Sequence, residues 1–471
     1  MSRRAWIISP FWDATVFIAS PLLVIAAFVP LRGWVRSEQL SLWLLAFFTF
    51  GHHLPGFLRA YGDREMFARF RWRFLLAPPL VLAVSVWTDQ RNLHGLLFLV
   101  FAWDIWHVLM QQYGFLRIYD AKLGVTDGRT ARLDHALTLS WYITLIVISP
   151  HYRHDLLLRL FSSGVPIFSP SALSAAETVL LAFSGALTLL YVLHHRRRPV
   201  NWRKLAALGS FLFATWYLYV ALDDFIAGFA IWSAFHCLQY FGIVWAFHQK
   251  RRDQPGALPA WMRMLFRPRP ALVLCYLGLI FAYGGINYAA RLLKGGAVSR
   301  LLMCLVISSG ALHYYYDAFM WKIREPETAR TLRLPVMAGM LRSPSLAQAA
   351  LFAVALGALS LLEIRRPNAE VSVLEALTRL SPEAAVSHLN WGNVLRRQGR
   401  LGDAEKTFAR AAELEPRMPL SRYQLGLALA AQGKDLQAAD AFRQAHELDS
   451  SLTEARKNAA MLWTKGGIEA V

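Results

Sequence analysis

Residues 225–247 read FIAGFAIWSAFHCLQYFGIVWAF, an apolar stretch of 23 residues without a single Asp, Glu, Lys or Arg. A helix of about 20 apolar residues is long enough to cross the hydrocarbon core of a bilayer. The stretch therefore predicts a membrane-spanning helix, and its one histidine, His236, would lie inside the membrane.

The composition of the whole chain also indicates a membrane protein. Of its 471 residues, 56% are apolar and only 17% are charged, with 17 Trp and 29 Phe. The core of a soluble protein does not hide that much apolar surface, and so many large apolar groups exclude disorder. The three cysteines show no CxxC spacing, so neither a disulfide framework nor a zinc knuckle is supported.

Long apolar runs recur along most of the chain and predict an all-α protein. We expect a polytopic transmembrane bundle of about 11 spans over residues 1–366, followed by a soluble helical repeat domain over residues 367–471. The chain begins Met-Ser-Arg-Arg without a cleavage site, so the first run is read as an uncleaved span. The expected spans lie near 13–31, 40–58, 74–90, 94–116, 135–150, 174–194, 205–222, 225–247, 271–289, 301–320 and 345–363.

The basic residues between these runs predict the topology. The net charge of +19 resides in the first 367 residues; there, the N-terminus and every second loop hold 27 Lys and Arg, against 8 in the other loops. Positive loops stay in the cytoplasm, so the N-terminus is predicted to be cytoplasmic and the C-terminal domain periplasmic, in a bacterial inner or plasma membrane. Because these charges set topology, nucleic acid is not an expected partner.

The C-terminal segment contains a repeat of 34 residues. Its positions are Gly392, Gly399, Ala404, Phe408 and Ala411, which recur as Gly426, Gly433, Ala438, Phe442 and Ala445. The pattern resembles the tetratricopeptide repeat (TPR), in which small residues let two antiparallel helices approach and an aromatic ring fills the gap. The resemblance covers about 385–450, with a third helix at 453–466, and implies a stack of hairpins that binds a protein or peptide through residues 385–466. A short docking or oligomerisation module is an equally supported alternative.

Ionisable side chains inside the predicted spans are the unusual feature, because such groups are costly at bilayer depth. Those singled out lie on the second, fourth, eighth and tenth spans, which are predicted to run from outside to inside; they are His52, His53, Asp104, His107, His236, His313 and Asp317. Counted from the outer end, His53, His107, His236 and His313 fall at residues 14, 14, 12 and 13 of their spans. At a helical rise of about 1.5 Å per residue they differ in depth by only about 3 Å.

A layer of imidazoles at one depth is what a buried metal centre needs, since imidazole is the commonest protein ligand for iron, copper and zinc. The predicted metal ligands are His52, His53, His107, His236 and His313. The predicted catalytic residues are Tyr240 and Asp317, and the predicted supporting residues around the ligands are Asp104, Gln111 and Gln239. In the alternative interpretation each histidine only forms a hydrogen bond between helices.

Three short segments also resemble the histidine-bearing helices of the Brp/Blh-type β-carotene dioxygenases. They are Gly51-His52-His53-Leu54-Pro55-Gly56, Phe235-His236-Cys237-Leu238-Gln239-Tyr240-Phe241 and Leu312-His313-Tyr314-Tyr315-Tyr316-Asp317. The resemblance implies a polytopic membrane protein whose intramembrane histidines, here His53, His107, His236 and His313, hold a non-haem iron. This chain departs from the family at Tyr240, where the family has a second histidine, and in its appended repeats and larger number of spans.

Three functions follow as hypotheses. The first is a membrane oxidoreductase or oxygenase that uses non-haem iron on a lipophilic substrate, with the repeats as a protein-interaction domain. The second is a non-enzymatic membrane-anchored TPR scaffold, or a transporter that uses the histidines as a proton path. The third, a multispan glycosyltransferase with TPR repeats, is less favoured because the first external loop holds only one acid, Glu38.

Overall fold

The computed structural model describes residues 5–196, 198, 200–222, 224–293, 295–322, 326–334, 345–365 and 370–465. In that part of the chain every regular element is a helix, which confirms the all-α prediction. The chain divides into two compact units. The first comprises residues 1–145, 180–221 and 226–361, and the second comprises residues 146–179, 222–225 and 362–471.

The second unit therefore includes two stretches that the sequence assigns to the membrane domain. The expected domain boundary at residues 366–367 lies outside the described residues. The helices up to α16 are α1 (Pro10–Trp12), α2 (Ser20–Phe28), α3 (Ser37–Trp43), α4 (His53–Gly62), α5 (Arg64–Gln90), α6 (Gly95–Lys122), α7 (Gly128–Ile148), α8 (Pro150–Ser162), α9 (Pro170–His195), α10 (Trp202–Trp216), α11 (Phe225–Arg252), α12 (Ala260–Leu265), α13 (Pro270–Leu292), α14 (Gly296–Met320), α15 (Pro326–Leu332) and α16 (Ser345–Ile364). The remaining helices are α17 (Glu370–Leu380), α18 (Ala385–Arg397), α19 (Leu401–Leu414), α20 (Pro419–Ala430), α21 (Asp435–Leu448) and α22 (Thr453–Lys465).

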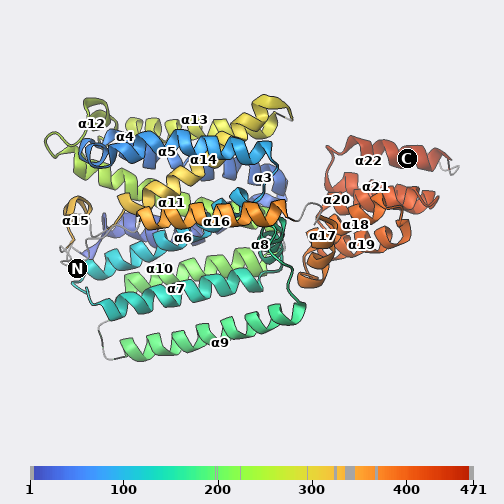
Figure 1. The fold of residues 1–471 in the computed structure, drawn as a ribbon, viewed down its shortest axis with the longest axis horizontal. Helices are drawn as coiled ribbons and strands as arrows, with labels where there is room; N and C mark the ends of the chain where they lie inside the picture. Colours follow the sequence, from blue (N-terminus) through green and yellow to red (C-terminus); the bar gives the residue numbers. More distant parts are fainter. Residues whose placement is uncertain are drawn as a thin grey trace. The chain divides into compact units, whose positions relative to one another are not determined.

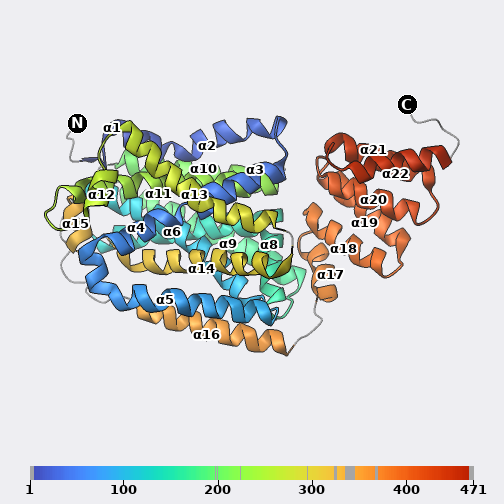
Figure 2. The same ribbon diagram turned by 90° about the horizontal axis from the view of Figure 1, so that it is seen from above.

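The long helices of the first unit run side by side, as the two views in Figures 1 and 2 show. Helix α11 is central, since 78% of its most apolar 18-residue stretch is buried in the protein. The buried share of the corresponding stretch is 11% in α5 and 11% in α9. The outer helices direct apolar side chains away from the bundle, for example Leu75, Leu76 and Leu80 of α5. Such an outward apolar surface is what a bilayer solvates.

Six helices in the described part of the chain are long and apolar enough to cross a membrane. They are α5, α9, Trp202–Ala221 (α10 with its last turn), Ile226–Arg252 within α11, α13 and α14. A bent pair, Pro10–Ile18 and Ser20–Gly33, would make a seventh if counted as one span. The expected number of about 11 therefore stays a prediction.

Two expected spans, 40–58 and 94–116, are not among the six helices that could cross a membrane, and a helix break in one and polar residues in the other explain why. The expected span at 40–58 is broken: α3 leads into a π-helical turn over Leu44–Phe50, and α4 begins anew at His53. Helix α6 has 28 residues, but Asp104, His107 and Gln111 reduce its hydropathy. Both interruptions fall where the predicted metal ligands lie, and π-helical turns are frequent at functional sites.

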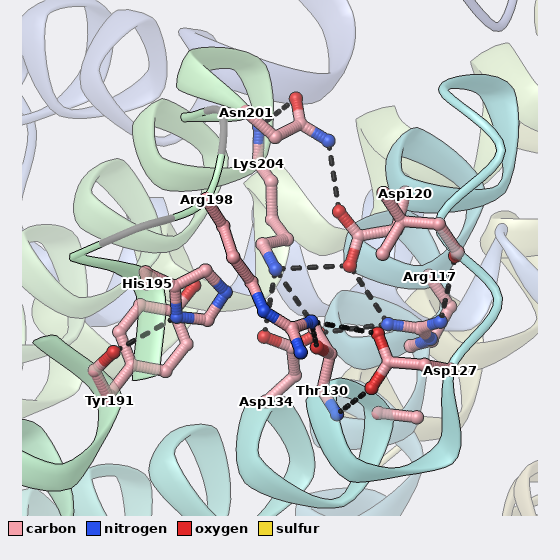
Figure 3. A network of polar contacts seen from close by, with 12 residues as sticks. Arg117, Asp120, Asp127, Thr130, Asp134, Tyr191, His195, Arg198, Asn201 and Lys204 are labelled. Atoms are coloured by element: carbon pink, nitrogen blue, oxygen red, sulfur yellow. Dashed lines mark hydrogen bonds and ion pairs between the residues drawn. The ribbon is translucent and has the colours of Figure 1, made fainter. Parts of the chain in front are cut away.

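A buried ring of four charges ties α6, α7 and α10 together (Figure 3). Arg117 donates hydrogen bonds to Asp120 at 2.8 Å and to Asp134 at 3.0 Å. Lys204 donates to the same two carboxylates, at 3.0 Å in each case. None of the four side chains is more than 6% exposed. Two cations and two anions cancel, so burial is tolerable as long as the ring is complete.

In the second unit α17 to α22 pack in series, each helix against the next (Figure 1). The repeated small residues lie at the closest approach. A Cβ atom placed on Gly392 would lie 2.6 Å from the ring of Phe408, and one on Gly426 would lie 2.7 Å from the ring of Phe442. The 34-residue period thus corresponds to a repeated helix–ring contact.

Candidate metal centre

The local sequence places the five histidines at the middle of the first unit. His52 directly precedes α4 and His53 begins it, while α6, α11 and α14 each contribute one imidazole from their interior. All five side chains are at most 8% exposed. These helices are held by apolar packing around them, so the imidazoles are directed inward by the fold itself.

The five imidazoles converge. Ring centroids of His52 and His313 lie 4.5 Å apart, those of His107 and His313 lie 4.7 Å apart, and those of His107 and His236 lie 5.1 Å apart. His53 stacks on His313 at 4.8 Å. The structure therefore brings together all the histidines that the sequence singles out.

Three of them form a group with the spacing that a metal ion requires. One ring nitrogen from each of His52, His107 and His313 lies within 4.8 Å of the others. The Nε2 atoms of His107 and His313 are 3.2 Å apart. Two nitrogens at about 2.1 Å from one ion are separated by ~3.0 Å at a right angle and ~3.4 Å at a tetrahedral angle. The observed separation lies between these values, and it also permits an N–H···N hydrogen bond between the two rings.

Hydrogen bonds to the outer side of the rings set the tautomer of His52. Its Nδ1 contacts the carbonyl oxygen of Thr49, and a carbonyl only accepts, so Nδ1 carries the proton. The Nε2 atom of His52 then has a free lone pair, is buried and has no hydrogen-bond partner among the residues that the structure describes. A backbone carbonyl that orients a ligating imidazole in this way is the usual arrangement at protein metal sites.

His53 and His236 also retain buried nitrogens without a partner. The Nδ1 atom of His53 lies 2.9 Å from Ser309 Oγ, which in turn is 2.8 Å from the hydroxyl of Tyr283. Within the described part of the chain, its Nε2 atom and both ring nitrogens of His236 have no hydrogen-bond partner. Leaving such groups unsatisfied in an apolar interior costs free energy, so this donor set fits a metal ion better than a purely structural core.

Asp317 and Tyr240 lie directly beside the triad. The Oδ2 atom of Asp317 is 3.8 Å from Nε2 of His313 and 4.0 Å from Nε2 of His107. The Tyr240 hydroxyl donates to Oδ1 of Asp317 at 2.8 Å and accepts from Trp321 at 3.1 Å. The carboxylate is thus held on one side, with its other oxygen turned toward the histidines.

The other predicted supporting residues contact side chains or backbone around the imidazoles. Asp104 accepts a hydrogen bond from the Tyr314 hydroxyl at 2.9 Å, and the ring of Tyr314 lies 5.0 Å from that of His107. Gln111 donates to the backbone carbonyl of His236 at 3.1 Å, and Gln239 donates to that of Phe17 at 3.3 Å. These amides therefore position backbone around the site rather than the imidazole rings.

Several residues of the site are not indicated by the sequence. Thr49, Ser309 and Trp321 are ordinary residues of an apolar run and gain their role from the helices opposite them. Arg59 is fully buried, with its guanidinium 4.1 Å from the ring centroid of Phe247 and 3.9 Å from that of Trp321. Only the pair Ser308-Ser309 inside an apolar helix gives a hint in sequence.

The fold and the site define an all-helical protein with several helices that could span a membrane and with a buried histidine triad. Comparison with protein-family models, with curated proteins and with solved structures finds no match. The functional conclusion therefore depends on the chemistry of the site.

Proposed function

We propose that the protein is an integral membrane oxidoreductase that holds a non-haem iron at His52, His107 and His313 and acts on a lipophilic substrate. The observation that carries the proposal is the convergence of three buried ring nitrogens within 4.8 Å. His53 and His236, whose free nitrogens border the triad, complete the set of candidate ligands.

The bound iron would supply redox chemistry with dioxygen as the oxidant. The chain's own residues hold and orient it: the Thr49 carbonyl fixes the tautomer of His52, and Asp317 places a carboxylate oxygen within 4.0 Å of the other two ligand nitrogens. Tyr240 holds that carboxylate and is a candidate proton donor, because its hydroxyl donates to Asp317 and its ring centroid lies 5.1 Å from that of His313.

The lipophilic substrate is inferred from the surroundings of the site. The triad lies among helices whose outer faces are apolar, and its ligands are buried. A compound dissolved in the bilayer would not need to cross water to approach such a site. The same proposal includes about 11 spans and a cytoplasmic N-terminus. It also includes a TPR domain at residues 385–466 that binds a protein or peptide partner.

Metal analysis of detergent-purified protein tests the proposal. We expect iron in the wild type and loss of most of it in His107→Ala and in His313→Ala. The matched control is His248→Ala. His248 is also buried on α11, and its Nε2 has no hydrogen-bond partner among the described residues. It differs in that its ring stacks on Phe266, with centroids 4.4 Å apart, and in that it lies outside the described group of histidines that could hold a metal. This variant should keep the metal.

The outcomes separate the hypotheses. Zinc in place of iron would contradict the redox function, because zinc has no redox chemistry. A metal-free wild type, or metal that is insensitive to both histidine changes, would remove the enzyme proposal. A membrane-anchored scaffold would then be favoured, and capture of a partner by the C-terminal repeats would support it.

A further inference from the structure

Helix α8 lies in the connection between α7 and α9 and belongs to the same compact unit as the repeats. The Ser149 hydroxyl caps it by accepting from the backbone N–H of Tyr152, and Pro150 occupies its first position. With 13 residues it is about 20 Å long, too short to cross a bilayer. It also carries several ionisable residues, so it lies outside the membrane.

One face of α8 is buried against the first two helices of the repeat region, α17 and α18. Leu157 and Phe161, four residues apart, are 4% and 1% exposed and share a core with Leu374, Leu377 and Val394. The opposite face carries Asp155 and Arg159, which pair with each other. The apolar face of α8 therefore occupies a surface that the repeats would otherwise expose.

Polar contacts fix the position of α8 on the repeats. Arg153 is 7% exposed and donates to Ser381 at 3.2 Å and to Glu383 at 2.8 Å, and it also pairs with Glu177 at the start of α9. His154 lies 2.6 Å from Ser387 Oγ. Burial lowers the pKa of His154 to about 3, so the ring is neutral and this contact persists at physiological pH.

The end of α16 joins the same unit. Gly164, with a φ of +85°, follows α8, and a Cβ atom built on it would lie 2.6 Å from the backbone of Leu362 in the last turn of α16. Only a glycine permits both this φ and this approach. The loop after α8, the last turn of α16 and the repeats are thus packed together.

We propose that α8 is the resident partner of the first repeat helices and that α16 is a membrane-spanning helix. The reason is that two segments on the same side of a membrane must be separated by an even number of crossings. Among the described residues between α8 and α17, five helices qualify as spans, namely α9, the α10 segment, α11, α13 and α14. Five crossings would put α8 and α17 on opposite sides of the membrane, yet they are in contact. One more crossing is required.

Helix α16 is the element that supplies it. Its 20 residues extend about 30 Å, which matches the hydrocarbon core, although its apolar part, Ala350–Ile364, is shorter than the six candidate spans. Its one charged residue is Glu363 at the end. Residues 222–225 also belong to the second unit. Two spans, α9 and the α10 segment, separate them from α8, and four spans, α11, α13, α14 and α16, separate them from α17. Both numbers are even, so these residues lie on the same side of the membrane as α8 and α17. The repeats, the α8 loop and this turn then face one aqueous compartment.

Cysteine labelling on intact and permeabilised cells tests the topology. Single changes Ser169→Cys, Ser450→Cys and Asp253→Cys are made in a Cys275→Ala background, since Cys237 and Cys304 are buried. All three sites are exposed. A membrane-impermeant maleimide should reach residues 169 and 450 from the same side and residue 253 from the other side. Labelling of residues 169 and 450 from opposite sides would overturn the proposal.

A cross-link tests the docking separately. In the same background the double change His154→Cys, Ser387→Cys should form an intramolecular disulfide under mild oxidant, detected by mass spectrometry of the joined peptides. Adding Arg153→Glu should reduce its yield severalfold, whereas Arg159→Glu on the opposite face should not. Free thiols at both positions in a protein that labels normally at residue 450 would refute the docking. Neither readout depends on a bound metal.

Discussion

Gly56 is the residue at which one added methyl group should damage the proposed metal centre. It lies in α4, one turn after His53. A Cβ atom at this position would lie 2.7 Å from the Tyr240 hydroxyl, 3.2 Å from Nδ1 of His313 and 3.6 Å from Asp317 Oδ1. Gly56→Ala therefore places a methyl group among a candidate ligand and the two candidate catalytic residues.

The size of the effect follows from these distances. Ordinary contact begins at 3.4 Å, so the hydroxyl of Tyr240 must move by about 0.7 Å. Such a shift along its 2.8 Å bond to Asp317 would bring that bond to the limit of hydrogen bonding. Strain of about 1–3 kcal/mol is partly offset by the roughly 1 kcal/mol that alanine gains over glycine in a helix. Stability should change little, whereas loss of the support around a ligand lowers metal affinity about 10–100-fold.

Gly114→Ala is the matched control, because Gly114 lies inside α6 and its added Cβ has no atom of the described residues within 4 Å. Iron affinity is measured by competition with a chelator, and unfolding by thermal denaturation in detergent. Wild-type iron affinity in Gly56→Ala would refute the assignment of Tyr240 and Asp317 to the site. Equal losses in both variants would show that the effect is not local.

Two further changes test the packing of each unit. Lys204→Met leaves the buried carboxylates of Asp120 and Asp134 with one cation, Arg117, among the described residues, so the free energy of unfolding should fall by about 3–5 kcal/mol. Gly392→Val drives a side chain into the ring of Phe408, and thermal denaturation should show a loss of about 1–3 kcal/mol in the second unit.

Each of these changes has a control in the same unit. Arg198→Ala removes an exposed pair with Asp127 and should cost at most about 1 kcal/mol. Gly402→Val makes the same replacement in α19, where a Cβ atom on Gly402 has no neighbour within 4 Å in the described part of the chain, so the second unit should keep its stability. A Lys204→Met protein as stable as the Arg198→Ala protein would contradict the role of the charge ring.

Much of the fold can be read from local sequence, because helix formation and membrane solvation depend on neighbouring residues. The stretch at 225–247 becomes the most buried of the apolar helices, and the period of 34 residues becomes a repeated contact between a glycine and a ring. The break before His53 and the docking of α8 are not readable in this way, since both depend on helices distant in sequence.

The sequence by itself determined that the chain is helical and apolar, and it predicts one shared depth for four histidines, because the predicted depth depends only on counting residues along each expected span. Only the tertiary structure decided that their rings face one another. The direction of a side chain around the helix axis depends on how each helix is rotated against its neighbours, and long-range packing sets that rotation. The same packing gives the Thr49 carbonyl, Ser309 and Tyr240 their places beside the imidazoles.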